Sequence, residues 1–365
     1  MPHSVRPIVA IVLPPKEGFA AHAVGAVGLL ARRHAVASHY FRSVVFGLPQ
    51  QQPFPGVEFR AVRPSWLPGS ATRRYARAVL RQLRALRPDL IEVHNRPDVA
   101  LFLAARCRGI PVTLFLHNDP QTMRDARTAG ERKMLNHRMA RIIAVSSYIA
   151  TRMPPSGSVT VLPNCLDLAA IPPSPPERAP VILFAGRVVA DKGADSFVRA
   201  CALALPHLPG WRAEMIGADR FRADSPETPF LAGLRREAAA AGVRLLGYRP
   251  HDDVLAAMAQ AAIVVVPSRW PEPFGLTALE ALAAGAALVY APTGGLPDVV
   301  GDAGVPINPD DPAAIAAVLT ALAADPTRRA ALGRGARARA AGFETANIVA
   351  MLDVLRRQTL DARTG

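Results

Sequence analysis

Short apolar runs rich in Val and Ile organise this chain of 365 residues, and they end at Gly, Pro, Asn or Asp. Segments with the apolar period of a helix separate the runs, which is the pattern of β-α-β units. The runs are continuously apolar, so both faces of each strand are expected to be covered. The pattern therefore predicts an α/β protein with parallel sheets wrapped by helices.

Eleven of these runs are predicted to be strands. In the first half of the chain they are residues 7–13, 43–47, 89–94, 112–117, 141–146 and 159–163. In the second half they are residues 181–186, 212–217, 243–248, 262–268 and 286–292. The chain is about twice as long as one α/β core needs, so we expect two Rossmann-like, doubly wound domains.

A proline-rich stretch marks the predicted boundary between the domains. Residues 172–176 read Pro-Pro-Ser-Pro-Pro, which cannot continue a helix and forms a stiff connector. We expect an N-terminal domain over 1–171 and a C-terminal domain over 177–340. A last helix within 341–365 could pack back on the N-terminal domain. Two such domains are expected to face each other across a cleft at the carboxyl ends of their strands, where ligands bind.

Membrane spans, leader segments and metal sites are not indicated by the sequence. The apolar run 312–324 is too short to cross a bilayer, and the N-terminus resembles a first strand more than a signal peptide. Three scattered cysteines without CxxC spacing argue for a reducing compartment. There is no Asp-x-Asp triplet or carboxylate cluster suited to Mg²⁺. We therefore expect a cytoplasmic protein that needs no metal or other cofactor.

The formal net charge of +14 lies in one part of the chain. Residues 1–176 contain 23 Lys and Arg against 9 Asp and Glu, whereas 177–365 contain 20 of each kind. Only 3 of the 43 basic residues are lysines, so codon bias is one explanation of the surplus. An acidic partner is the other, and its candidates are nucleic acid, an anionic membrane and a phosphorylated substrate. Nucleic acid is disfavoured, because the aromatic content is 6% and aromatics do not interleave the basic residues.

Arginines gather on the predicted helix 72–86. A stripe at spacings of three and four residues is formed by Arg73, Arg77, Arg81 and Arg84. The stripe is either an ordinary solvated face or a contact with an anionic membrane surface, where each basic residue contributes about 1 kcal/mol. A second basic segment, 124–141, could face an acceptor.

Two carboxylates lie in the otherwise apolar segment 267–285. Glu280 is the only charged residue of its predicted helix and must meet hydrogen-bond donors. A backbone cap or an Arg could satisfy it, and so could the vicinal diol of a ribose. Glu272 lies in the turn before the helix, either as a solvated carboxylate or beside a ligand. An anion site is expected at the free amides of the helix start, which belong to Phe274, Gly275 and Leu276.

Other candidates lie where predicted strands end. The segment 184–193 delivers Arg187 and Lys192 to one loop, where they are either solvated cations or partners of phosphate oxygens. His117 ends a strand and either faces the cleft or serves a following helix. Gly18 follows the first strand and is expected to precede a helix, in a turn that is not G-x-G-x-x-G.

Taken together, these segments resemble the GT-B retaining glycosyltransferases of family 4, which include sucrose synthase, phosphatidylinositol mannosyltransferases and lipopolysaccharide-core hexosyltransferases. The E-x7-E pair within EPFGLTALE (272–280) is the strongest match. FAGRVVADKG (184–193) looks like the G-R-x4-K-G segment of that family. Weaker matches are VSSYIA, VLPNCLD and GGLPDVV, at residues 145–150, 161–167 and 294–300.

In the second domain the resemblance implies a role for each candidate. Glu280 would bind the ribose hydroxyls of a nucleotide, and Glu272 with the amides of 274–276 would hold the donor sugar. Arg187 and Lys192 would stabilise the leaving diphosphate, which is where negative charge develops.

The remaining implied roles concern the first domain and the base. Gly18 would approach the β-phosphate, His117 would contact the sugar, and Tyr248 lies where the family cradles the base. Two departures stand out: Glu17 precedes Gly18 where the family has a second glycine, and Cys165 stands where the family has Gly.

The resemblance implies transfer of a hexose, with retention, from a UDP- or GDP-sugar to a glycan or lipid-linked acceptor. Bacterial lipopolysaccharide, exopolysaccharide or glycolipid synthesis is the expected setting. Two cations and a helix N-terminus would then substitute for a metal. A nucleotide-sugar hydrolase or epimerase on the same fold is one alternative, and a basic nucleic-acid-binding protein is another. The expected location is the cytoplasm, with peripheral binding to the inner face of the membrane if the basic surplus is functional.

Overall fold

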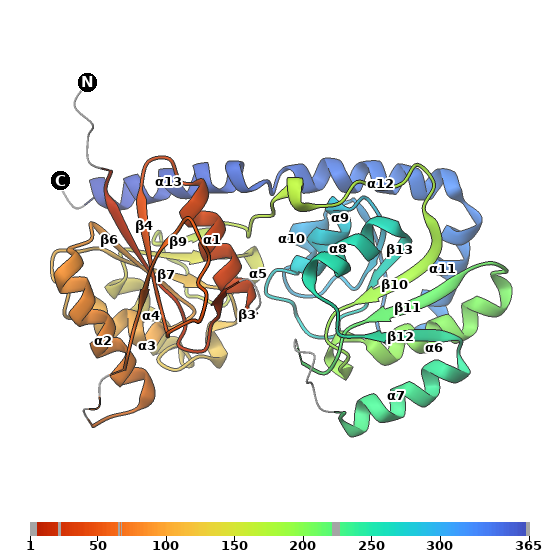
Figure 1. Cartoon of the computed structure of the whole chain (residues 1–365), viewed down its shortest axis with the longest axis horizontal. Coiled ribbons are helices and arrows are strands. Elements are labelled where there is room, and N and C mark those ends of the chain that lie inside the picture. Colours follow the sequence, from red (N-terminus) through yellow and green to blue (C-terminus); the bar gives the residue numbers. More distant parts are fainter. Residues whose placement is uncertain (1–5, 21–22, 65, 67, 221–226, 363–365) are drawn as a thin grey trace. The chain divides into compact units, whose positions relative to one another are not determined.

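The computed structural model describes residues 6–20, 23–64, 66, 68–220 and 227–362, and the chain forms two compact units (Figure 1). Unit 1 comprises Met1–Cys165 and Thr345–Gly365, and unit 2 comprises Leu166–Glu344. Each unit has its own parallel sheet and its own apolar core.

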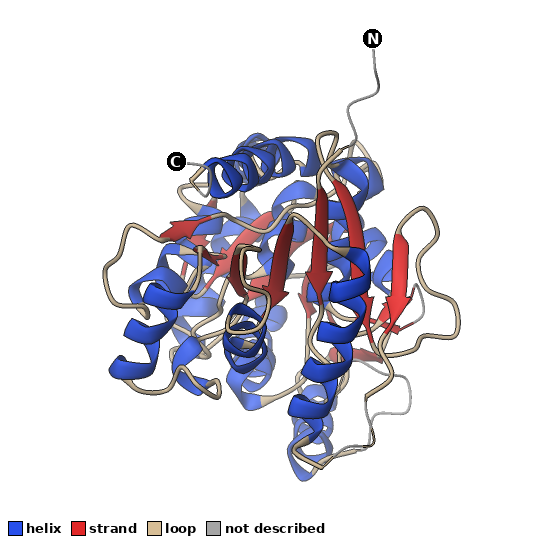
Figure 2. Ribbon diagram, turned by 90° about the vertical axis from the view of Figure 1, so that its left-hand side faces the viewer, coloured by secondary structure: helices blue, strands red, loops and turns tan. Residues whose placement is uncertain are grey.

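In the described part of unit 1, seven parallel strands form one sheet with helices on both faces (Figure 2). In spatial order they are β5 (Glu58–Ala61), β4 (Arg42–Gly47), β1 (Ile8–Val12), β6 (Leu90–His94), β7 (Val112–Leu116), β8 (Arg141–Ala144) and β9 (Val159–Val161). The helices are α1 (Ala26–Ala37), α2 (Ala71–Leu86), α3 (Pro97–Ala104), α4 (Ala129–Arg138), α5 (Ser147–Thr151) and α13 (Thr345–Asp361), with the 3₁₀ turn η1 (Pro120–Thr122). A small antiparallel pair is formed by β2 (Phe19–Ala20) and β3 (Ala23–Val24).

In the described part of unit 2, six parallel strands form the second sheet. In spatial order they are β12 (Val243–Gly247), β11 (Arg212–Ile216), β10 (Ala179–Ala185), β13 (Ala261–Val266), β14 (Ala287–Tyr290) and β15 (Gly304–Pro306). The helices are α6 (Ala194–Ala204), α7 (Pro229–Ala240), α8 (His251–Gln260), α9 (Leu276–Ala283), α10 (Leu296–Val300), α11 (Pro312–Ala324) and α12 (Pro326–Ala341). Shorter 3₁₀ turns are η2 (Leu168–Ala170), η3 (Ala190–Lys192) and η4 (Leu205–His207).

The α/β class with two doubly wound parallel sheets is confirmed. All eleven predicted strands are present, each within two residues of its predicted ends. The pattern missed β5, β15 and the β2–β3 pair, because each of these strands has four residues or fewer. In addition β5 reads Glu-Phe-Arg-Ala and is an edge strand, so it lacks a continuous apolar run.

The unit boundaries fall after Cys165 and after Glu344. The proline-rich segment 172–176 therefore lies inside unit 2. The reason is local bonding, since the Ser174 hydroxyl donates to the Ala284 carbonyl at 2.9 Å and accepts from Arg178 at 2.7 Å. The C-terminal helix α13 belongs to unit 1, where it packs against α1.

Strand order reverses once in each sheet, between β1 and β6 in unit 1 and between β10 and β13 in unit 2. Connections on the two sides of such a reversal lead to opposite faces of the sheet, and this leaves a crevice outside the carboxyl ends of the strands. Ligand-binding residues are expected at these two places. No helix in the described part of the chain is long and apolar enough to cross a membrane.

A buried ion pair ties α13 to the sheet of unit 1. The Arg356 guanidinium donates to both carboxylate oxygens of Glu92 on β6, at 2.7 and 2.8 Å, and to Asp353 at 3.1 Å. Asp353 in turn accepts two hydrogen bonds from the Ser38 hydroxyl, at 2.9 and 3.0 Å. Arg356 is 1% exposed and Glu92 is fully buried. Such a pair is costly to break, because the remaining charge has no partner.

We predict that Arg356→Leu lowers the free energy of unfolding by about 3–5 kcal/mol, because it leaves Glu92 buried and unpaired. The neighbouring Arg357 is exposed and lies over the Tyr40 ring, so Arg357→Leu is the matched control and should cost about 1 kcal/mol or less. Urea unfolding followed by circular dichroism measures both variants. Equal destabilisation by the two would show that the buried pair does not hold α13.

Candidate functional site

Lys192 and Glu272 meet at the order reversal of unit 2. Lys192 ends the turn η3 that follows β10, and Glu272 lies in the loop after β13. The Lys192 ammonium donates to the Glu272 carboxylate oxygen Oε1, and the buried Ser268 hydroxyl donates to the same oxygen at 2.8 Å. The two charged side chains are 21% and 13% exposed. The pair is therefore held in place yet open to a ligand on one side.

Glycines let the loops around this pair touch each other. Gly193 has φ +68°, and a Cβ there would lie 1.9 Å from the Pro267 carbonyl oxygen. Gly294 has φ +60°, and a Cβ there would lie 2.3 Å from the Glu272 carbonyl oxygen. That same carbonyl accepts a hydrogen bond from the Gly295 amide at 2.6 Å. No side chain fits at Gly193 or Gly294, so the approach of the loops depends on both glycines.

Arg269, which sequence reasoning did not single out, fastens the loop after β13 to α6. Its guanidinium donates to both oxygens of Asp195, at 2.7 and 3.1 Å, and to Asp310 at 2.6 Å. The hydrogen bond to Asp195 raises the pKa of Arg269 above its usual value. The loop that carries Glu272 is thus anchored by a permanently charged group.

The start of α9 lies a few residues after Glu272 and is uncovered. Gly275 is its N-cap with φ +100°, and no side chain caps the helix. The backbone amides of Phe274, Gly275 and Leu276 donate no hydrogen bond to any residue that the structure describes. The Phe274 ring is buried against Phe343, so only its backbone can meet a ligand. Uncovered amides at a helix start attract anions.

Arg187 is the other cation of this edge of the sheet. It follows β10 directly after Gly186 and is half-buried. Its guanidinium forms no hydrogen bond or ion pair with any residue that the structure describes. A half-buried Arg with open donors suits the oxygens of a phosphate.

Glu280 is satisfied by a histidine rather than by the backbone cap or Arg considered from the sequence. Its side chain is 11% exposed, and its Oε1 atom lies 2.8 Å from Nε2 of His251, the first residue of α8. Tyr248, which is 38% exposed, lies in the same loop between β12 and α8. Sequence reasoning missed His251, because 29 residues separate it from Glu280.

In unit 1 the expectation that Gly18 precedes a helix is wrong. The small strand β2 follows Gly18, and α1 begins only at Ala26. The start of α1 is covered by Glu17, whose Oε1 atom accepts from the Gly28 amide at 2.8 Å. Burial raises the pKa of Glu17, while hydrogen bonds from the α1 amides act in the opposite direction. In this chain a carboxylate therefore fills the helix start of unit 1.

His117 lies in a buried aromatic stack at the carboxyl edge of the unit 1 sheet. Its Nε2 atom is 2.9 Å from Nδ1 of His94, and both rings lie parallel to Phe115. The Asn95 side chain, on a residue with φ +58°, accepts hydrogen bonds from the amides of His117 and Asn118 at 3.0 and 3.1 Å. Sequence reasoning missed His94, although it ends β6 as His117 follows β7.

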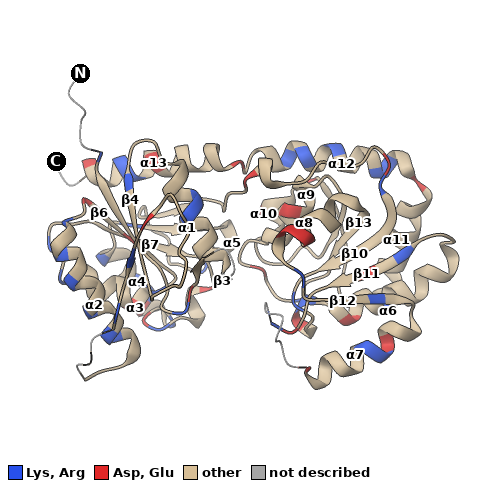
Figure 3. Cartoon of the chain, in the orientation of Figure 1, with Lys and Arg blue, Asp and Glu red and all other residues tan. Residues whose placement is uncertain are grey.

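The predicted arginine stripe on α2 is only partly free. Arg73, Arg81 and Arg84 are exposed, whereas the Arg77 guanidinium donates to the Pro68 carbonyl at 2.7 Å. Figure 3 shows Lys and Arg residues along α2. Among the described residues there is no group of three or more His, Cys, Asp or Glu that could hold a metal ion.

The buried histidines of unit 1 predict a loss of stability in acid. Burial lowers the pKa of His117 from 6.5 to about 4 and lowers the pKa of His34 well below 6.5. The unfolded chain therefore binds protons first, so stability is full above pH 6.5 and falls toward pH 4. His117 accounts for a loss of about 2 kcal/mol at pH 5, and His34 adds a loss in the same direction. Both ring nitrogens of His34 lack partners in the structure, so His34→Leu should reduce this loss without weakening the protein at pH 7.

Urea midpoints at about pH 7 and pH 5 test this prediction. The exposed His137 provides the matched control, and His137→Gln should leave the acid-induced loss unchanged. An equal loss in His34→Leu and the wild type would mean that His34 does not contribute to it.

Two family models match consecutive parts of the chain. Residues 26–170 match Glycosyltransferase Family 4, and residues 171–339 match Glycosyl transferases group 1.

Curated relatives match shorter stretches. The chain is 36% identical over 201 residues to D-inositol 3-phosphate glycosyltransferase 1 of Catenulispora acidiphila, which covers 52% of this chain and 47% of that protein. It is 28% identical over 282 residues to glycogen synthase of Mycobacterium tuberculosis, which covers 70% of this chain and 65% of that protein. The chain thus spans about half to two thirds of the length of these relatives.

Solved structures share the fold over nearly the whole chain. Sucrose-phosphate synthase from Thermosynechococcus elongatus has a TM-score of 0.79 at 20% identity and covers 98% of this chain and 100% of its own. HepE from Anabaena, in complex with UDP and glucose, has a TM-score of 0.75 at 19% identity and covers 95% of this chain and 99% of its own.

Proposed function

We propose that the chain transfers a hexose such as glucose or mannose from a nucleotide sugar to an acceptor, because residues 26–170 match Glycosyltransferase Family 4 and residues 171–339 match Glycosyl transferases group 1. The observation that carries this proposal is the Lys192–Glu272 pair beside the uncovered start of α9. Cations next to free amides suit a diphosphate, and a carboxylate suits sugar hydroxyls. The UDP and glucose held by HepE make UDP-glucose the first donor to test.

The proposed chemistry follows the charge that develops in the reaction. When the sugar–phosphate bond breaks, negative charge grows on the diphosphate and positive charge on the sugar ring. Arg187 and Lys192 would offset the charge on the diphosphate, together with the α9 amides. These two cations would supply the positive charge that a metal ion provides in other enzymes, so we propose a metal-independent reaction. One carboxylate oxygen of Glu272 accepts a hydrogen bond from Lys192, and the other would accept a hydrogen bond from a sugar hydroxyl.

Glu280 is proposed to bind the two ribose hydroxyls. Its Oε1 atom is held by His251, so the orientation of the carboxylate is fixed before a nucleotide arrives. Tyr248 is exposed in the neighbouring loop and is proposed to lie beside the base.

The roles of unit 1 remain proposals that rest on the family resemblance. Gly18 would approach the β-phosphate and His117 would contact the sugar. The pKa of His117 is lowered by burial to about 4, so at pH 7 its imidazole is neutral and can act as a hydrogen-bond partner. Retention of the anomeric configuration is proposed on the same resemblance.

The acceptor is proposed to be a glycan or a lipid-linked saccharide, with lipopolysaccharide, exopolysaccharide or glycolipid synthesis as the setting. The relatives include an inositol-phosphate glycosyltransferase and a glycogen synthase, so phosphorylated and polymeric acceptors both belong in the first panel.

We predict that a UDP- or GDP-sugar raises the melting temperature of the wild type and that Glu280→Ala binds the same donor about tenfold or more weakly, because the ribose hydroxyls lose a charged partner. Thermal shift followed by calorimetry measures both. Glu237, an exposed carboxylate on α7, provides the matched control, and Glu237→Ala should bind like the wild type.

Two results would overturn the donor assignment. One is the absence of binding by UDP-, GDP- and ADP-sugars, and the other is unchanged binding by Glu280→Ala. Product analysis with and without an acceptor panel separates transfer from simple hydrolysis, because a hydrolase releases the free hexose whether or not an acceptor is present.

We also propose peripheral association of α2 with the inner face of the cytoplasmic membrane. Arg73, Arg81 and Arg84 project from this helix, and Trp66 shortly before it is 88% exposed. Basic and aromatic side chains together are typical of contacts with anionic lipid surfaces.

Sedimentation with vesicles tests this association. The protein should sediment with phosphatidylglycerol vesicles at low salt and be released at high salt, because the attraction is screened. Arg73→Gln/Arg81→Gln should bind less, by about 2 kcal/mol for two removed charges. Equal sedimentation of the wild type with neutral and anionic vesicles would contradict the proposal.

A further inference from the structure

A cavity of about 310 Å³ lies at the edge of the unit 1 sheet where the strands begin, opposite the edge formed by their carboxyl ends. Arg87 stands between α2 and β6, and Ile110 lies just before β7, so both loops lead into the amino ends of their strands. His94 and His117 lie at the carboxyl ends of the same two strands. Five residues of strand separate the two edges, which is about 16 Å. The cavity is therefore distinct from the histidine stack.

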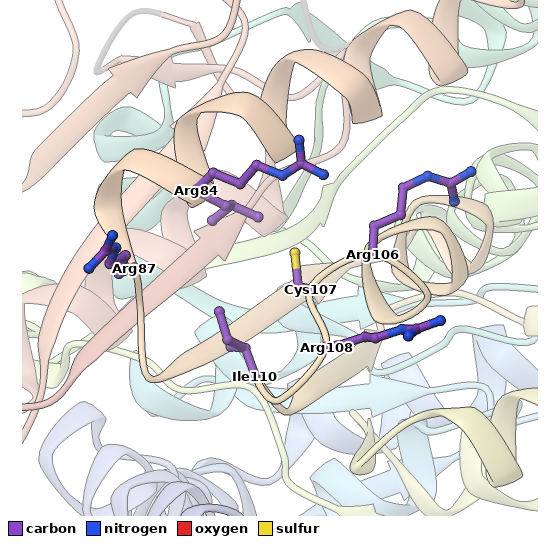
Figure 4. A pocket seen from close by; sticks show the side chains of 7 residues that line it. Arg84, Arg87, Arg106, Cys107, Arg108 and Ile110 are labelled. Atoms are coloured by element: carbon purple, nitrogen blue, oxygen red, sulfur yellow. The ribbon is translucent and has the colours of Figure 1, made fainter.

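Four arginines line this cavity, and no carboxylate does. They come from two separate segments: Arg84 and Arg87 from the end of α2, and Arg106 and Arg108 from the loop between α3 and β7. In Figure 4 the Arg84 and Arg106 side chains lie above and to the right of the Cys107 thiol, whereas the Arg87 and Arg108 side chains extend away from it. Among the described residues none of the four forms an ion pair, although Arg106 stacks on the Phe102 ring at 4.1 Å.

All four arginines are exposed, so water and salt screen their mutual repulsion. The carboxyl end of α2 offers a partial charge of about −0.5, which Arg84 and Arg87 complement by themselves. Arg106 and Arg108 add positive charge beyond what that helix end needs. Arg87 has φ +53°, a left-handed conformation in which glycine would be unstrained.

The floor of the cavity is apolar. It is formed by Leu83, Ile110 and Cys107, and burial raises the pKa of the Cys107 thiol, so the thiol is neutral at pH 7. The volume corresponds to about ten water molecules at about 30 Å³ each. This is more than one inorganic phosphate needs and matches the lower end of pockets for small organic ligands.

We propose that this cavity binds a phosphate monoester with a small organic body, the phosphate on the arginine forks and the body on the apolar floor. Guanidinium groups bind phosphate oxygens in pairs, and arginines that approach from two segments suit a group with several charged oxygens. The ester is either a soluble sugar phosphate or the headgroup of a phosphatidic acid. The proposal does not depend on the transfer reaction proposed above, because it concerns the opposite edge of the unit 1 sheet.

Calorimetry on the full chain tests the proposal with glucose 6-phosphate, inorganic phosphate and glucose as probes. Glucose 6-phosphate should bind, inorganic phosphate more weakly, and glucose not at all. Arg106→Gln/Arg108→Gln should weaken binding of glucose 6-phosphate about tenfold or more, because both lost groups donate to a charged ligand. Arg236 is exposed on α7 in unit 2 and does not line the cavity, so Arg236→Gln is the matched control and should bind like the wild type.

A second arm distinguishes the two sources of the ester. Phosphatidylcholine vesicles with and without phosphatidic acid are sedimented with the wild type and both variants. Binding of glucose 6-phosphate assigns a soluble ester. Binding only to phosphatidic acid vesicles, with the same loss in Arg106→Gln/Arg108→Gln and not in Arg236→Gln, assigns the lipid headgroup.

The proposal is overturned if neither glucose 6-phosphate nor phosphatidic acid vesicles bind, or if Arg236→Gln weakens binding as much as the double variant. It is also overturned if the double variant keeps full affinity, since the ester then binds elsewhere. Circular dichroism spectra and melting curves of the variants confirm that they are folded. Alkylation of Cys107, followed by mass spectrometry, gives an independent readout, because a ligand in the cavity should slow it.

Discussion

The close approach of three loops, which follow β10, β13 and β14, determines the geometry of the candidate site. Gly193 lies against the Pro267 backbone, and Gly294 lies against the backbone of Glu272. Lys192 and Glu272 adjoin these contacts, so their ion pair depends on backbones that only glycine allows to meet. Arg269 fixes the same loop to α6 through Asp195. The chemistry of the site thus follows from backbone packing, and the charged side chains are placed by it.

A helix begins near the carboxyl edge of the sheet in each unit, and the two helix starts differ. In unit 2 the amides at the start of α9 are uncovered and Gly275 offers no cap. In unit 1 the start of α1 is filled by the Glu17 carboxylate, which takes the place an external anion would occupy. An anion that reached the α1 amides would have to displace Glu17. The donor phosphates are therefore expected to depend chiefly on unit 2.

Sequence pattern predicted the strands and the candidate residues more readily than the partners of those residues. The apolar runs located all eleven strands, and the E-x7-E and G-R-x4-K-G segments pointed to Glu272 and Lys192, which the structure places in contact. His251, His94 and Arg269 were missed because each acts on a residue between 23 and 74 positions away. Such pairings are set by strand order, and a single sequence carries no local signal for strand order.

Codon bias alone does not account for where the arginines lie. A bias toward Arg codons would add arginines without regard to nearby carboxylates, and many would then find partners by chance or point into solvent. In unit 2 Arg269 is paired with Asp195, whereas Arg187 forms no ion pair with a described residue. In unit 1 four arginines from two segments line one cavity without a carboxylate, and one of them, Arg87, has a left-handed backbone. A phosphate bound there would supply the negative charge that the lining residues do not.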